Sequence, residues 1–91
     1  MIETILAVVK GRLNMLESDT ALDTYLTERI KAAIGELNEA GIHLRNSSRD
    51  IVFAADYVCW QYSNRDKNEP MPDWLRLARR ERWLSEVRHD T

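Results

Sequence analysis

A repeat of apolar residues at helical spacing constrains the fold of this chain most strongly. Five large aliphatic side chains recur every three or four positions between residues 19 and 41, namely Leu22, Leu26, Ile30, Ile34 and Leu37. That spacing places them on one stripe of an α-helix. Asp19 or Thr20 is the expected N-cap of this helix. Gly41 is its expected end, because glycine adopts the left-handed conformation without steric cost.

Two more helices are expected on either side of this one. Residues 2–13 carry apolar side chains at helical spacing, and residues 14–19 form a connector. A third helix is expected from Ser48 or Asp50 to about Asn64. Its IVFAADYVCW run is apolar nearly all round, which predicts a central helix covered on several sides. A strand is the alternative for such a run, but its two alanines and the capping signal favour a helix.

A fourth helix is expected from Pro72 to about Val87, after a loop at residues 42–48 and a charged turn at residues 65–71. Proline suits the first helical position, where its missing N–H has no cost. No strand pattern is present, and the connections are short. The sequence therefore predicts an all-α fold, a compact bundle of about four helices, with residues 1–91 forming a single domain.

Composition narrows the classes of protein to which the chain can belong. It is 44% hydrophobic and 31% charged, which is typical of a soluble globular domain, and its formal net charge is −2. That charge predicts no general attraction to nucleic acid or to an anionic membrane. The N-terminal stretch does not resemble a signal peptide, and no apolar run is long enough for a membrane span. The single cysteine, Cys59, excludes an internal disulfide and favours a reducing, cytosolic setting.

Four side chains were considered for chemistry, and none predicts catalysis or metal binding. His43 and His89 are expected to be solvated surface residues, and Cys59 a small buried hydrophobe. Asp56 is the one charged residue in the middle of the apolar run. It is either a catalytic acid or a carboxylate that is exposed or paired with an arginine, and the second is favoured because no other base stands at a useful spacing. We expect no enzyme, no cofactor and no metal.

Arginines gather in the fourth helix, together with tryptophans. A helical wheel predicts that its core-facing side consists of Trp74, Leu77, Ala78 and Leu84. The residues predicted to contact a partner lie away from that stripe and are Arg76, Arg79, Arg80 and Trp83. A large aromatic flanked by arginines is typical of a protein–protein hot spot. Alternatively, Trp83 packs under a neighbouring segment while the arginines are solvated, or the helix binds nucleic acid, against which the net charge weighs.

A motif in the second half of the chain resembles a known family. It consists of an aromatic-rich helix with DYVCW at residues 56–60, an Asn-Arg-Asp turn within YSNRDK at residues 62–67, and a helix start MPDWLR at residues 71–76. This pattern is similar to the C-terminal half of tailed-phage head–tail connector (adaptor) proteins. It covers about a third of the chain. The residues that match the family pattern, and are expected to act as framework, are Trp60, Arg65, Trp74 and Leu75.

The resemblance implies a structural role in the virion. Connector subunits form a ring that docks the portal protein on one side and the tail or stopper protein on the other. DNA passes through the channel of the ring, where arginines could touch phosphate without reading sequence. The implied location is the head–tail interface, with assembly in the host cytoplasm and no membrane. The alternative is a small helical DNA-binding or regulatory domain encoded by a phage or prophage.

Overall fold

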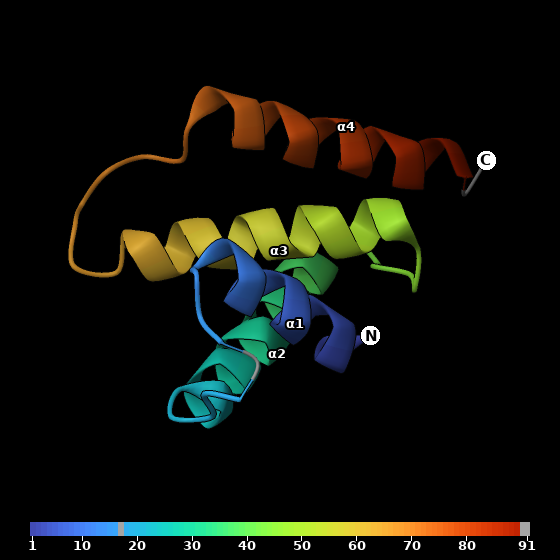
Figure 1. Cartoon of the computed structure of the whole chain (residues 1–91). Helices are drawn as coiled ribbons and strands as arrows, with labels where there is room; N and C mark the ends of the chain where they lie inside the picture. Colours follow the sequence, from blue (N-terminus) through green and yellow to red (C-terminus); the bar gives the residue numbers. More distant parts are fainter. Residues whose placement is uncertain (17, 90–91) are drawn as a thin grey trace.

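The chain folds into α-helices joined by short connections, as the sequence predicts (Figure 1). The computed structural model describes residues 1–16 and 18–89. In these ranges there are four helices and no strand, namely α1 (Ile2–Arg12), α2 (Asp23–Glu39), α3 (Ser48–Ser63) and α4 (Asp73–His89). The expected all-α fold of about four helices is therefore confirmed.

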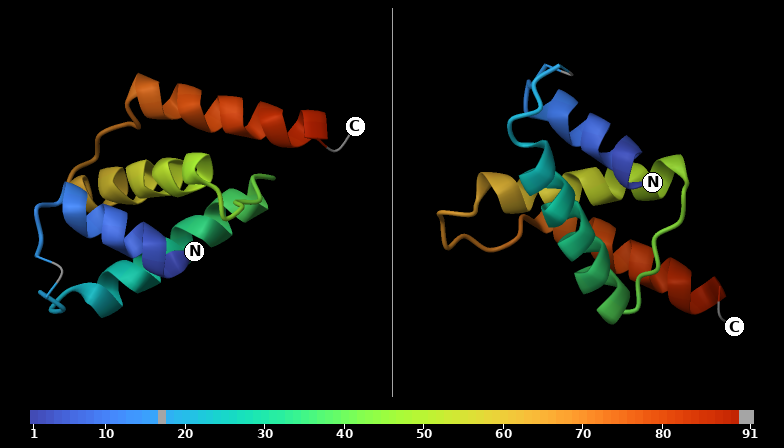
Figure 2. Two further views of the ribbon diagram at one scale, coloured as in Figure 1. Left: turned by 45° about the vertical axis from the view of Figure 1, so that its right-hand side comes forward. Right: turned by 90° about the horizontal axis from the view of Figure 1, so that it is seen from below.

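Helix α3 lies between the other helices. Figure 1 and the two views in Figure 2 show α1 and α2 against one side of α3 and α4 along the other. Several neighbouring positions of α3 are buried, which are Phe53, Ala54, Ala55, Tyr57 and Val58. A helix has this many buried positions only when neighbours cover most of its circumference. The prediction of a central helix is confirmed.

The core is built mainly by α1, α2 and α3. Its fully or nearly buried apolar residues include Ile5 and Val9 from α1 and the stripe Leu26, Ile30, Ala33 and Leu37 from α2. Helix α4 adds a single fully buried apolar side chain, Leu75, to this core. Within the described residues, α4 packs against α3 and against no other helix. The fourth helix is therefore attached to a three-helix core along one side.

The N-terminus of α2 differs from the expected one, whereas that of α3 agrees with it. Helix α2 begins at Asp23, later than predicted, and the side chain of Asp19 instead accepts a hydrogen bond from the backbone N–H of Ala21 at 3.1 Å. Asp19 thus closes the turn that precedes the helix. At α3 the N-cap is Ser47, whose hydroxyl accepts from the backbone N–H of Asp50 at 3.3 Å. The predicted start at Ser48 is confirmed.

Gly41 and Pro72 lie at helix ends, at or next to the positions that the sequence predicts for them. Gly41 follows α2 with a φ of +91°, in the left-handed region that favours glycine. Pro72 precedes the first residue of α4, and its carbonyl accepts from the backbone N–H groups of Leu75 and Arg76. Pro72 is thus one position earlier than expected, outside the helix proper. Both residues set the direction in which the chain leaves or enters a helix.

Candidate partner-contact surface

The side of α4 that faces the protein body carries buried charges, and the predicted core-facing stripe is wrong for Trp74 and Leu77, whereas Ala78 packs against the core. Leu75, Arg82 and Glu86 are buried on this side, whereas Trp74 is 57% exposed and Leu77 is 59% exposed. Ala78 and Leu84 are half-buried at the edge. The helix is rotated because buried partners for Arg82 and Glu86 come from segments far away in the sequence, which a helical wheel cannot show.

Those partners form a network that ties α4 to α3 and to the loop after α2. Arg82 donates from Nε to Oδ1 of Asp50 at 2.8 Å and from Nη2 to Oδ2 at 3.2 Å. The same Nη2 donates to the carbonyl oxygen of His43 at 2.9 Å. Glu86 accepts from the backbone N–H of His43 at 2.7 Å and from the Arg45 guanidinium at 3.2 Å. These hydrogen bonds satisfy charges that would otherwise be costly to bury.

The network keeps its acids ionised and its base protonated. Burial raises the pKa of Asp50, but hydrogen bonds from Arg82 and from the Arg45 backbone, with nearby positive charge, outweigh it and leave the pKa below its ordinary value. The hydrogen bond from the His43 backbone is the largest cause of the lowered pKa of Glu86. The hydrogen bond to Asp50 likewise raises the pKa of Arg82. The folded state therefore favours the charged form of all three groups.

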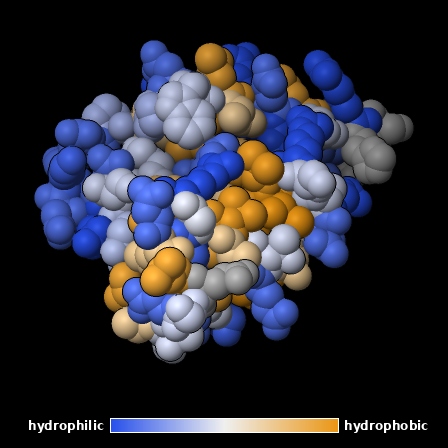
Figure 3. Space-filling model, viewed as in Figure 1, coloured by the Kyte–Doolittle hydropathy of each residue, from blue (hydrophilic) through white to orange (hydrophobic). Residues whose placement is uncertain are grey.

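Because the ion-paired side of α4 faces the core, two other flanks of the helix are exposed to solvent. The first, which we name the apolar flank, consists of Trp74 and Leu77 of α4, and Val52 of α3 is also 45% exposed. A groove between α3 and α4 adjoins it and is lined by Arg49, Val52, Phe53, Asp56, Ala78, Glu81 and Arg82. Figure 3 shows apolar side chains exposed below α4, over α1 and α3, on the face of the molecule seen in Figure 1. Exposed apolar side chains that lie together are typical of contact sites.

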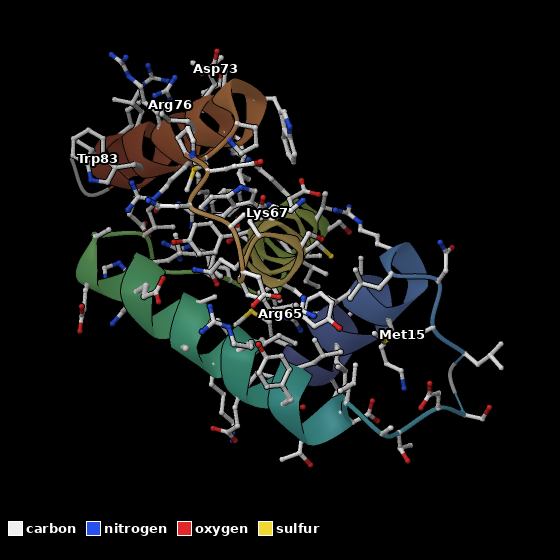
Figure 4. The ribbon with its side chains drawn as sticks, turned by 90° about the vertical axis from the view of Figure 1, so that its left-hand side faces the viewer. Met15, Arg65, Lys67, Asp73, Arg76 and Trp83 are labelled. Carbon is white, nitrogen blue, oxygen red and sulfur yellow. The ribbon has the colours of Figure 1, made fainter. Side chains whose placement is uncertain are left out.

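The second flank carries the predicted contact residues, and we name it the arginine flank. Arg76 and Arg80 are exposed, and Arg76 forms an ion pair with Asp73. Arg79 is half-buried, and its buried Nε has no hydrogen-bond partner in the described part of the chain. Figure 4 shows Trp83 and Arg76 projecting from α4 on the side nearer the end of α2. The structure thus places the four predicted residues Arg76, Arg79, Arg80 and Trp83 together.

Trp83 combines the two alternatives left open by the sequence. Its side chain is 42% exposed, yet its indole packs against the segment that follows α2. A Cβ placed on Gly41 would lie 3.4 Å from Nε1 of Trp83. Beside this contact is a hollow of about 310 Å³ lined by Ala40, Ile42, Arg76, Arg79, Arg80 and Trp83. Trp83 is therefore one wall of a cationic hollow rather than a free side chain.

The residues that match the family motif do not share one environment. Leu75 is fully buried, and Trp60 is half-buried against the core with an indole N–H that lacks a partner among the described residues. Arg65 is exposed and stacks its guanidinium 4.2 Å from the ring of Tyr62. Trp74 is exposed. Leu75 and Trp60 fit a framework role, whereas the position of Trp74 suits contact with a partner.

The side chains that the sequence offered as candidates for chemistry lie, within the described residues, in the environments that the sequence favoured. Asp56 forms an ion pair with Arg12 of α1. Cys59 is half-buried, and burial raises the pKa of its thiol. The ring of His43 is largely exposed, with Nδ1 3.3 Å from Glu86, and the side chain of His89 lies outside the described residues. No cluster of three or more potential metal ligands occurs in the described ranges.

Sequence reasoning missed the ion-pair network. The sequence predicts Asp50 only as a possible start of α3 and indicates no structural role for Glu86. The one local signal is the spacing of Arg82 and Glu86, four residues apart on one helix face, with Nη2 and Oε1 3.6 Å apart. Such pairs are common on exposed faces, so this signal alone does not indicate burial.

Comparisons with known proteins add no relative. Neither the models of protein families, nor the curated proteins, nor the solved structures include a match to this chain. Among the described residues, no helix has both the length and the apolar character that crossing a bilayer requires.

Proposed function

We propose that this chain is a structural virion assembly protein, a head–tail connector subunit of a tailed phage. In this role it forms a ring at the head–tail interface, docks the portal protein and the tail or stopper protein, and lets DNA pass. It acts by binding and carries out no catalysis or cofactor chemistry. Assembly takes place in the host cytoplasm. The resemblance of residues 56–76 to that family supports the proposal.

The single observation that carries the proposal is the orientation of α4 on the helical core. Its inward side is held by ion pairs, so its tryptophans and several aliphatic side chains are left on two outward flanks. Trp74 and Leu77 lie on one flank and Trp83 on the other, each more than two-fifths exposed. A monomer gains nothing from exposing these side chains to water. A subunit that contacts partners on both sides of one helix needs this arrangement.

A DNA-binding role has weaker support. Arg82 is buried in the network and Arg76 is paired with Asp73, so the arginines of α4 do not form one continuous basic face. Phosphate contacts require exposed cations at the protein surface. Arg80 remains exposed and is available for the non-specific contact with DNA that a channel would allow.

The test mixes the purified chain with the portal ring of the phage or prophage whose genome encodes it, and measures the mass of the complex. We expect wild-type protein to bind the ring. The Trp74→Ala plus Leu77→Ala variant should bind about tenfold more weakly or worse, because exposed anchors of this kind dominate binding. Val87→Ala, which removes an exposed side chain from the other flank, is the matched control and should bind like wild type.

Two results would overturn the proposal. One is a portal ring that fails to bind the wild-type chain, together with infectious particles after disruption of the gene. The other is tight binding of duplex DNA with a steep salt dependence that Arg76→Ala plus Arg80→Ala abolishes. The second result would establish the regulatory alternative.

A further inference from the structure

One end of the molecule carries an isolated apolar side chain among acidic residues. Leu16, in the connector between α1 and α2, is 73% exposed, more than any other large hydrophobic residue in the described ranges. Residues 13–23 hold three carboxylates and no lysine or arginine, and Lys10 of α1 pairs with one of them, Asp23, and donates a hydrogen bond to the backbone carbonyl of Asp19. Of these, Asp19 is exposed. We name Leu16 and Asp19 the acidic knob.

The opposite end carries a hollow of complementary character, the cationic hollow described above. Ile42 and Ala40 provide apolar surface, and Ile42 is only 1% exposed. Arg76, Arg79 and Arg80 surround it. Arg76 forms an ion pair with Asp73, so the net positive charge around the hollow comes from Arg79 and Arg80. The buried Nε of Arg79 lacks an acceptor within the described chain, which a carboxylate entering the hollow would supply.

The knob and the hollow of one molecule cannot meet. The knob precedes α2 and the hollow adjoins its end, and the 17 residues of α2 separate them by about 25 Å. Figure 4 shows Met15, next to the knob, and Trp83, at the hollow, at opposite corners of the molecule. Complementary surfaces at opposite ends of one chain make a head-to-tail contact between copies, which closes into a ring when the rotation permits.

We propose that the acidic knob of one copy inserts into the cationic hollow of the next. Leu16 covers the apolar surface of Ala40 and Ile42, and Asp19 pairs with the arginines. The occupant of the hollow is therefore a second copy of this chain. The inference deepens the proposed connector function, since it assigns the surfaces through which the ring forms.

The first experiment uses two variants that each damage one side of the contact. Leu16→Ser plus Asp19→Ser removes the apolar side chain and the charge of the knob, and Arg76→Glu plus Arg80→Glu reverses the charge of the hollow. Each should fold, because the altered side chains are exposed, and circular dichroism checks this. Each alone should lose concentration-dependent self-association, by about tenfold or more, in analytical ultracentrifugation. An equimolar mixture retains one intact knob and one intact hollow, so it should form a 1:1 dimer and nothing larger.

A second experiment traps the contact even where association is weak. In a Cys59→Ser background, Leu16→Cys plus Ala40→Cys should give, on mild oxidation, a ladder of disulfide-linked copies that ends at the ring. The single Leu16→Cys variant should give dimers at most, because it has no cysteine in the hollow. A mixture of the knob variant and the hollow variant that stays monomeric, together with a double-cysteine protein that gives no ladder, would overturn the inference.

The outcomes separate this inference from the function on which it rests. If the wild-type chain binds the portal ring while the knob variant and the hollow variant both self-associate like wild type, the proposed knob–hollow contact is wrong and the connector role stands. If the variants behave as expected but no portal binds, the contact stands and the connector role falls. If the hollow variant alone loses portal binding and self-association is unaffected, the portal occupies the hollow and the inference is overturned.

Discussion

Arg82 of α4 and Asp50 of α3 form a buried, two-point ion pair, with Nε to Oδ1 at 2.8 Å and Nη2 to Oδ2 at 3.2 Å. Their side chains are only 7% and 4% exposed. Because α4 adds one fully buried apolar residue to the core, this pair and the neighbouring Glu86 contacts hold much of the helix in place. The outward position of Trp74 and Trp83 depends on it.

Replacing Arg82 with alanine should therefore loosen α4. Asp50 would be left buried without its main partner, which costs about 3 kcal/mol of unfolding free energy. Chemical denaturation measures that loss, and hydrogen exchange should show faster opening of the α4 amides than of the α1 and α2 amides. Arg80→Ala is the matched control, since Arg80 is exposed on the same helix. Equal stability of the two variants would show that the pair does not hold the helix.

Acid should weaken the fold through the same network. The pKa values of Asp50 and Glu86 lie below their ordinary values, which are about 4. The unfolded chain then binds protons at a higher pH than the folded chain, so their contribution is complete above about pH 5 and falls as the pH is lowered. Denaturation followed from pH 6 to pH 2 should show this decline. Asp50→Asn plus Glu86→Gln should be less stable at pH 6 and should show a shallower decline.

The sequence predicts the helices and the core well but the orientation of α4 poorly, and both outcomes have one physical reason. The stripe from Leu22 to Leu37 and the all-round apolar run of α3 are local patterns, and burial follows from them directly. The orientation of α4 depends on Asp50 and on the backbone of His43, which reach Arg82 and Glu86 only after the chain has folded. A wheel that counts apolar residues assigns a buried arginine to solvent, so it placed Trp74 and Leu77 toward the core instead of Arg82.

The contact residues on α4 were predictable only in part. The grouping of Arg76, Arg80 and Trp83 follows from their spacing on one helix, and all three line one hollow. The hollow beside them could not be predicted, because Ala40 and Ile42 come from the segment after α2. The sequence also does not show that Leu16 is exposed to solvent and Ile42 is buried, because both are aliphatic residues in connecting segments.

A pair of glycine substitutions separates backbone strain from helix propensity. Gly41 has a φ of +91°, which strains any residue with a side chain, so Gly41→Ala should lower the unfolding free energy by about 1–2 kcal/mol. Gly35 lies within α2 with nothing near its missing Cβ. Gly35→Ala should raise the unfolding free energy by about 0.5–1 kcal/mol. Thermal unfolding of the two variants measures both, and a Gly41→Ala protein as stable as wild type would remove the proposed strain.

Cys59 should react slowly with alkylating reagents in the folded protein. Burial raises the pKa of its thiol, and the positive charge of Arg12 offsets this only in part, so little thiolate is present at neutral pH. We expect alkylation by iodoacetamide at pH 7 to be about tenfold slower in the folded chain than in urea. Arg12→Ala should slow it further, because the attraction that favours the thiolate is removed. A folded chain that reacts as fast as the unfolded one would mean that Cys59 is an accessible, activated thiol and that chemistry at α3 has to be reconsidered.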